Sequence, residues 1–148
     1  MTVVLFSKID LNKIKIKKPI SVGLGNYRLN INYNQDYLLI QTPTLYNPFD
    51  ISRFDSLDIL INSMEDIGFI EVIKYISGLA EKMADSYDLE YINSIKHNEY
   101  SPDKRLRLNI SSSCVVFNKD KNKINISNLK GKTMAKYIIC PKYIWMNY

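Results

Sequence analysis

The chain has 148 residues, enough for one domain, and its residues are 46% hydrophobic and 24% charged. These values exclude a disordered chain, a collagen-like chain and a disulfide-dense mini-protein, because each of those classes has a strongly biased composition. The net charge of +5 is weak evidence for a polyanionic partner, because an AT-rich genome also enriches Lys, Asn and Ile.

The charges are unevenly distributed along the chain. Residues 1–35 carry six Lys or Arg and one acid, residues 36–100 carry four and twelve, and residues 101–148 carry ten and two. If the basic ends pair in one sheet, they would form the basic face expected of a polyanion binder. An ordinary mixed surface explains the same distribution.

The first predicted elements are strands. Residues 13–18 alternate Lys with Ile and stop at Pro19, which indicates an edge strand or an extended basic arm within residues 1–26. Residues 27–33 alternate with period two, placing Tyr27, Leu29, Ile31 and Tyr33 inward and Arg28 outward. Residues 37–42 predict a second strand, and we expect a hairpin between the two.

The middle of the chain predicts a loop, a strand and one helix. Pro43 and Pro48 bracket an extended loop, and residues 56–62 read as a third strand. Ser63 and Asp66 resemble a capping box before apolar residues with helical spacing through Met83. Residues 85–99 are acidic and polar, which predicts a second short helix or a loop.

The last third predicts strands again. Residues 104–110 alternate, with Arg105 and Arg107 pointing outward. Residues 114–117 and 123–126 predict a hairpin, and a further strand covers 134–140 before the chain ends with 141–148.

This order predicts one mainly β domain over residues 1–148 with one long helix. Strands on both sides of a helix suit an OB-fold-like five-stranded barrel with extra strands, and an α+β sandwich is the alternative. The N-terminus lacks the order of a secretory signal, and no stretch is long enough to span a membrane. Cys114 and Cys140 are therefore expected to be reduced, intracellular and buried.

Catalytic constellations are weak. The lone His97 lies in a polar stretch, and neither a metal-ligand cluster nor a phosphate-binding glycine loop is present in the sequence. Asp55 and Asp58 leave a carboxylate-based nuclease as the least favoured interpretation. We predict that the chain is not an enzyme and needs no cofactor or metal.

Residues 39–49 carry a resemblance. Their sequence, Leu-Ile-Gln-Thr-Pro-Thr-Leu-Tyr-Asn-Pro-Phe, resembles the Gln-Thr-Pro signature of single-stranded DNA-binding proteins of nucleo-cytoplasmic large DNA viruses, which are related to a phage-type protein with the same barrel. Segments 91–96 and 100–108 and the ending at Ile144-Trp145 are similar in order. The resemblance covers residues 27–146.

The chain also departs from that family. Asp50 stands where the family has Gly, so the turn after Phe49 must form differently. The family pattern continues past Trp145 into another strand, which is expected here to be missing or supplied by a partner. The acidic tail of phage-type relatives is not present either, so recruitment through a tail is not carried over.

The resemblance implies a binder of single-stranded DNA in viral replication, recombination or repair, at work in the cytoplasm or nucleus of the host cell or carried in the virion. Cations would neutralise phosphates while aromatic side chains stack on bases. The predicted binding residues are Arg28, Tyr46, Phe49, Arg105, Arg107, Lys130, Lys132, Lys136 and Trp145. Viral replication proteins and a second copy of the chain are further expected partners. We do not expect the chain to bind a membrane. The alternative function is a structural or assembly protein that binds protein through an open sheet edge.

Overall fold

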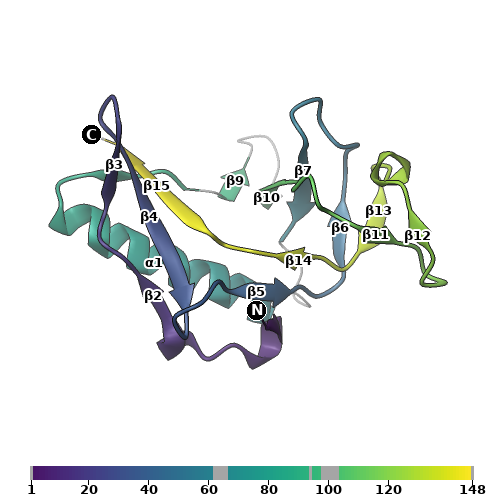
Figure 1. Ribbon diagram of the computed structural model, residues 1–148, viewed down its shortest axis with the longest axis horizontal. Coiled ribbons are helices and arrows are strands. Elements are labelled where there is room, and N and C mark those ends of the chain that lie inside the picture. Colours follow the sequence, from purple (N-terminus) through teal and green to yellow (C-terminus); the bar gives the residue numbers. More distant parts are fainter. Residues whose placement is uncertain (1, 62–66, 94, 98–103, 148) are drawn as a thin grey trace. The chain divides into compact units, whose positions relative to one another are not determined.

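The computed structural model describes residues 2–61, 67–93, 95–97 and 104–147. The fold is mainly β with one long helix among these residues, which confirms the predicted fold class (Figure 1). A curled half-barrel sheet of four antiparallel strands is consistent with an OB-like barrel that carries extra strands.

The chain divides into two compact units. Unit 1 comprises Met1–Pro43, Met64–Asn93 and Tyr137–Tyr148, and unit 2 comprises Thr44–Ser63 and Ser94–Lys136. The predicted domain over 1–148 thus has an internal division that the sequence did not indicate.

Unit 1 contains the long helix and two sheets among its described residues. The long helix is α1 (Ile67–Ser86), and two short 3-10 turns, η1 (Phe6–Lys8) and η2 (Leu11–Lys13), precede it in the chain. The larger sheet has the order β2-β4-β15-β8, with β3 also paired to β4; its strands are β2 (Ile14–Ile16), β3 (Ile20–Gly23), β4 (Asn26–Tyr33), β8 (Glu90–Tyr91) and β15 (Tyr143–Asn147). The smaller sheet has the order β1-β5-β14; its strands are β1 (Val3–Leu5), β5 (Leu39–Gln41) and β14 (Ile138–Ile139).

The two faces of the larger sheet differ in chemistry. β15 pairs antiparallel with β4, so that Ile144 lies opposite Leu29 and Trp145 lies opposite Arg28. Leu29 and Ile144 are buried, whereas Trp145 is exposed. Because side chains alternate across a strand, one face of this sheet is apolar and the other carries Arg28 and Trp145.

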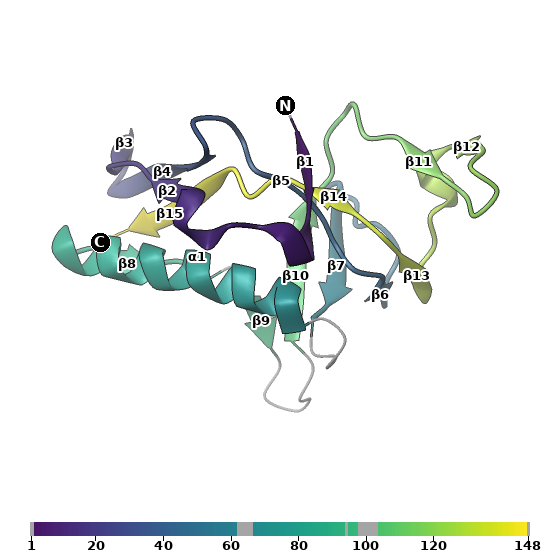
Figure 2. The same cartoon turned by 90° about the horizontal axis from the view of Figure 1, so that it is seen from below.

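Helix α1 also contributes to the apolar core of unit 1. Its buried side chains recur with helical spacing at Phe69, Val72, Ile73, Ile76, Ala80 and Ala84. The helix runs along the sheet (Figure 2). A hydrogen bond between the hydroxyls of Ser77 and Tyr91 (3.2 Å) connects it to β8. The predicted helix is therefore confirmed, although its predicted cap residues Ser63 and Asp66 lie outside the described residues.

The described residues 2–26 form the strands β1, β2 and β3 and the turns η1 and η2, and are not an extended arm. β2 pairs with β4, and Ile14 is buried beneath this pair. Residues 13–18 were predicted to be either an edge strand or an extended basic arm, and the structure shows the edge strand, β2. The described residues between 85 and 99 differ from both expectations, because α1 ends at Ser86 and the strands β8 and β9 (Ile95–His97) follow; residues 94, 98 and 99 lie outside the described residues.

The predicted hairpin between residues 27–33 and 37–42 is wrong. β5 pairs with β1 and β14, and only an isolated bridge joins Tyr33 to Asp36. The reason is that both edges of β4 are occupied, one by β2 and β3 and the other by β15. β5 therefore completes a different sheet.

Unit 2 is built from short strands. Its elements are β6 (Leu45–Asn47), β7 (Ser56–Leu60), β9, β10 (Lys104–Asn109), β11 (Val116–Phe117), β12 (Lys123–Ile124), the 3-10 turn η4 (Ile126–Asn128) and β13 (Thr133–Ala135). The sheets have the orders β7-β10-β9, β13-β6 and β11-β12. The predicted strand at 56–62 is confirmed over Ser56–Leu60 and the one at 104–110 over Lys104–Asn109, and the predicted hairpin at 114–126 is confirmed as the pair of β11 and β12.

The predicted strand over 134–140 is split into β13 and β14, which belong to different units. Tyr137, which lies between them, is held by Thr42: Tyr137 N–H donates to Thr42 Oγ1 (3.0 Å), and Thr42 N–H donates to Tyr137 O (2.9 Å). Burial raises the pKa of the Tyr137 hydroxyl to about 12. The alternation of residues 134–140 could not reveal this change of partner.

Both cysteines are exposed, contrary to the prediction that they are buried. Cys114 ends a turn in which its own N–H donates to Ser111 O (3.0 Å), and Cys140 follows the short strand β14. Neither position faces a core. In the described part of the chain, no helix has the length and apolar character needed to cross a bilayer.

Candidate functional site

The open face of the larger sheet in unit 1 carries an aromatic cluster, which we call the aromatic face: Arg28, Tyr143, Trp145, and the adjacent Tyr37 and Lys142. The guanidinium carbon of Arg28 lies 4.7 Å from the centre of the Tyr143 ring. Tyr143 and Trp145 meet edge to face, with ring centres 6.2 Å apart and planes inclined at 68°. Tyr143 is 36% exposed and Trp145 47%, so both rings are accessible.

The cations around these rings form no ion pair with the acids that the structure describes. Lys142 Nζ lies 5.1 Å from the Tyr37 ring centre and 5.2 Å from that of Tyr143. A hydrogen bond to the Tyr143 side chain raises the pKa of Lys142, which therefore stays charged at neutral pH. Arg28 takes part in none of the ion pairs among the described residues, which join Arg105 and Arg107 to Asp58.

Strand register adds two further cations to this face. Lys15 lies opposite Asn32, and Lys17 N–H donates to Asn30 O (3.0 Å), which places both lysines on the side of Arg28. Among the strands of this sheet, the acidic residue on the same side is Glu90, which lies on the outer strand β8 opposite Asn147. The aromatic face is therefore basic.

Two polar atoms beside the rings have no partner. Arg28 Nε and Asn30 Oδ1 are both buried, and neither forms a hydrogen bond. The Arg28 guanidinium is thus held by the Tyr143 ring through cation–π attraction and not by a carboxylate. This arrangement orients a charged group and two flat rings toward the same side of the sheet.

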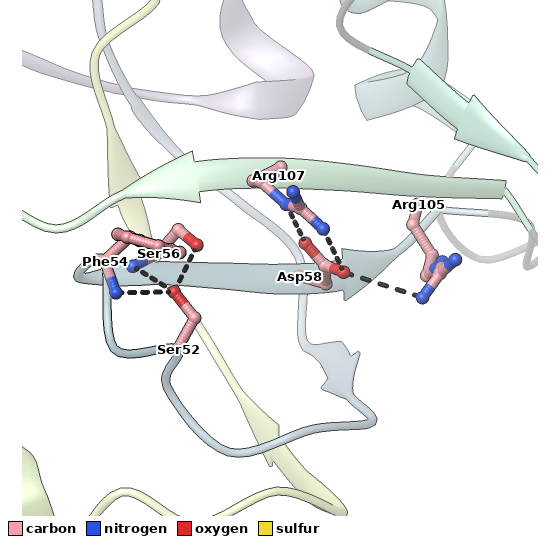
Figure 3. Close-up of polar contacts among 6 residues, drawn as sticks. All are labelled: Ser52, Phe54, Ser56, Asp58, Arg105 and Arg107. Carbon is pink, nitrogen blue, oxygen red and sulfur yellow. Dashed lines mark hydrogen bonds and ion pairs between the residues drawn. The ribbon is translucent and has the colours of Figure 1, made fainter.

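In unit 2, two predicted binding residues share one carboxylate (Figure 3). Arg107 donates from Nε to Asp58 Oδ1 (2.9 Å) and from an Nη atom to Oδ2 (3.4 Å), and an Nη atom of Arg105 lies 3.6 Å from Oδ2. The hydrogen bond from Arg107 to Asp58, and then the charge of Asp58, raises the pKa of Arg107. Asp58 therefore offsets part of the positive charge that the sequence assigned to this strand.

Phe49 forms the centre of a second exposed group, which we call the Phe49 surface. The Phe49 side chain is 52% exposed, and the guanidinium carbon of Arg105 lies 5.4 Å from the centre of its ring. Gly131 packs against the Phe49 main chain, and its neighbours Lys130 and Lys132 are exposed. Unit 2 therefore brings four of the predicted binding residues together.

The other predicted residues lie elsewhere. Tyr46 is half-buried on β6, opposite the exposed Met134, and Lys136 is exposed just after β13. Arg28 and Trp145 belong to unit 1. The predicted set is therefore divided between the two units, and nothing in the sequence indicated that division.

Tyr143, Tyr37, Lys142 and Asp58 belong to these surfaces but are not among the predicted binding residues. The signal for Tyr143 was present, because it lies two residues before Trp145 on the same strand and so shares its face. No local signal could reveal Asp58 as the partner of Arg107, because 49 residues separate them.

The residues of the Gln-Thr-Pro segment are mainly structural. Thr42 and Asn47 are fully buried. When the Asn47 amide group is oriented with its nitrogen toward two main-chain carbonyls, that nitrogen donates to Phe49 O (2.7 Å) and to Asp58 O (3.2 Å). These hydrogen bonds fix the loop to β7. Asp50, where the resembled family has Gly, accepts a hydrogen bond from Gly131 N–H through Oδ1 (2.6 Å). This hydrogen bond joins Asp50, in the turn after Phe49, to Gly131.

Metal and nucleophile chemistry find no geometric support in the described part of the chain. Among those residues no group of three or more His, Cys, Asp or Glu could hold a metal ion. Asp55, one of the two carboxylates considered for a nuclease, sits in a turn with φ of 55°, and Asp58 is occupied by the two arginines.

Comparison with known proteins finds no relative. No family model matches the chain, and neither curated proteins nor solved structures give a match.

Proposed function

We propose that this protein binds single-stranded DNA without reading its sequence, through the aromatic face of unit 1. The observation that carries the proposal is the pair of accessible rings, Tyr143 and Trp145, beside Arg28 on one open sheet face. Rings accept any base by stacking, while Arg28, Lys15 and Lys142 neutralise phosphates. Bases paired in a duplex cannot reach the rings, so single strands are preferred.

The Phe49 surface would make secondary contacts, because it combines an exposed ring with Arg105, Lys130 and Lys132. The resemblance of residues 39–49 to viral single-stranded DNA-binding proteins supports the same class of ligand. It also favours a role in viral replication, recombination or repair in the host cell. DNA is the proposed ligand in place of a protein because the aromatic face is basic and its rings are accessible.

The direct test is a titration of Trp145 fluorescence with oligothymidylate. Trp145 is the single tryptophan of the chain, so the signal reports the aromatic face. With three cations engaged, we expect log K to fall with log salt concentration with a slope of about −2, and duplex DNA to bind more weakly. Absent binding, a salt-insensitive response or equal affinity for duplex DNA would contradict the proposal.

A second experiment examines the Phe49 surface. Asp58→Asn removes the carboxylate that competes with phosphates for Arg105 and Arg107, so oligonucleotide affinity should rise by roughly three- to tenfold. Asp120→Asn is the matched control, because it makes the same charge change in the exposed turn between β11 and β12. Equal affinity gains in the two variants would show that the released arginines do not contact DNA.

The alternative, an assembly protein with an open sheet edge, requires a different edge from the one expected. β15 is paired with β4 on one side and with β8 on the other, so the C-terminal strand is internal. The outer strands of this sheet are β2 and β8. These edges do not compete with the DNA proposal, because the aromatic face lies on the surface of the sheet between them.

A further inference from the structure

The two outer strands of the larger sheet in unit 1 have main-chain groups that point away from the sheet. Lys17 N–H donates to Asn30 O, so by the alternation of an antiparallel ladder Ile16 directs its N–H and C=O outward. At the other edge, Ile92 N–H donates to Trp145 O (3.1 Å), so Tyr91 directs its main-chain groups outward. Outward groups of this kind are a template for pairing with another strand.

The strand directions allow the two edges to pair with each other. Along the order β2-β4-β15-β8 every neighbouring pair is antiparallel, so β2 and β8 run in opposite directions. A second copy placed beside the first in the same orientation would bring its β2 antiparallel to β8. The sheet would then continue from copy to copy without a change of pattern.

Register supplies a charge match. Pairing Ile16 of one copy with Tyr91 of the next satisfies the outward groups of both residues. The same antiparallel register places Lys17 opposite Glu90, and both are exposed and lie on the side of the aromatic face. Opposite charges that face each other across two strands attract.

The surfaces between each edge and α1 are also complementary. A groove of about 350 Å³ beside β2 is lined by Ile14, Lys15, Ile16, Tyr75, Leu79, Lys82, Met83 and Ser86, and its charged residues are both lysines. A groove of about 460 Å³ beside β8 is lined by Glu81, Ala84, Asp85, Leu89, Glu90, Tyr91 and Asn93, and its charged residues are all acids. One side of α1 is thus basic and apolar, and the other side is acidic.

From these features we infer that copies of this chain associate head to tail, with β2 of one copy paired to β8 of the next. The partner is a second copy because the same sheet carries both complementary edges, β2 and β8. The two edges have opposite strand directions, a compatible register and opposite charges. Such an interface uses two different surfaces, so it does not close as a two-fold dimer and can extend. It also aligns the aromatic faces of successive copies, and on the proposed function this makes DNA binding cooperative.

The test is sedimentation velocity of the full chain without DNA, over a range of concentrations at low and high salt. The wild type should associate, more weakly at high salt. Lys17→Glu and Glu90→Lys should each weaken association by on the order of tenfold, because attraction becomes repulsion. The double variant Lys17→Glu/Glu90→Lys restores opposite charges and should restore association, as should an equimolar mixture of the two single variants.

Lys119→Glu, in an exposed turn of unit 2, controls for the change in net charge and should leave association unchanged. A wild type that stays monomeric at all concentrations overturns the inference, and so does association that ignores both charge changes or that the double variant does not recover. If the chain stays monomeric and binds an acidic peptide, the partner of the β2 edge is another protein and the inference is overturned. Because DNA is absent from the test, failure here leaves the proposed function standing.

Discussion

Replacing Tyr143 and Trp145 together by alanine is expected to weaken binding of single-stranded DNA by about 10²- to 10⁴-fold. Each ring that stacks on a base contributes about 1–3 kcal/mol, and the two rings lie next to each other on one strand face. The change should leave the core intact, because the neighbours Ile144 and Met146, and not the rings, are buried against the apolar side. Fluorescence anisotropy of a labelled oligothymidylate measures the loss without relying on Trp145.

Phe54→Ala/Phe117→Ala is the matched control for this experiment. It also removes two exposed aromatic side chains, but from unit 2, whereas the aromatic face belongs to unit 1. Affinity should change by less than about threefold in the control, because surface aromatics that touch no base contribute nothing to stacking. An equal loss in both double variants, with unchanged thermal melts, would contradict the assignment of the aromatic face.

Gly131→Ala is expected to destabilise unit 2. A Cβ at this position would lie 2.6 Å from the carbonyl carbon of Phe49 and 2.8 Å from Asp50 N. These are main-chain atoms, so no side-chain rotation can relieve the clash, and overpacking of this kind costs about 1–3 kcal/mol. The hydrogen bond from Gly131 N–H to Asp50 would be strained as well.

Gly78→Ala is the matched substitution with the opposite expected sign. Gly78 lies inside α1 with nothing within 4 Å of an added Cβ, so alanine should stabilise the helix by about 1 kcal/mol. Denaturant unfolding followed by circular dichroism gives both free-energy changes. Amide hydrogen exchange then locates the loss in Gly131→Ala, which should be confined to β6, β7 and β13. A neutral Gly131→Ala would show that the loop after Phe49 can move away.

The orientation of side chains could be predicted well from the sequence. Alternation placed Leu29 inward and Arg28 outward, and the register of β4 with β15 confirms both positions. The same reasoning identified α1 from the spacing of its apolar residues. These features are local, because the periods of strands and helices are properties of the backbone and need no knowledge of the partner element.

The partners of the strands could not be predicted in the same way. β5 was expected to pair with β4, but β4 has both edges occupied by segments that come from the two ends of the chain. Residues 134–140 read as one strand and yet serve two units. Strand pairing depends on which edges remain free, and that depends on the whole topology.

The chemistry of the candidate site divides along the same line. Composition and alternation alone were sufficient to find a basic, tyrosine-rich chain with Arg28, Arg105 and Arg107 on outward positions. Only the tertiary structure decided which of these charges is available: Asp58 neutralises part of the charge of Arg105 and Arg107, whereas Arg28 lies against Tyr143 and pairs with none of the acids in the described part of the chain. The physical reason is that charge neutralisation acts over a few ångströms in space, between residues whose separation along the chain carries no information about their contact.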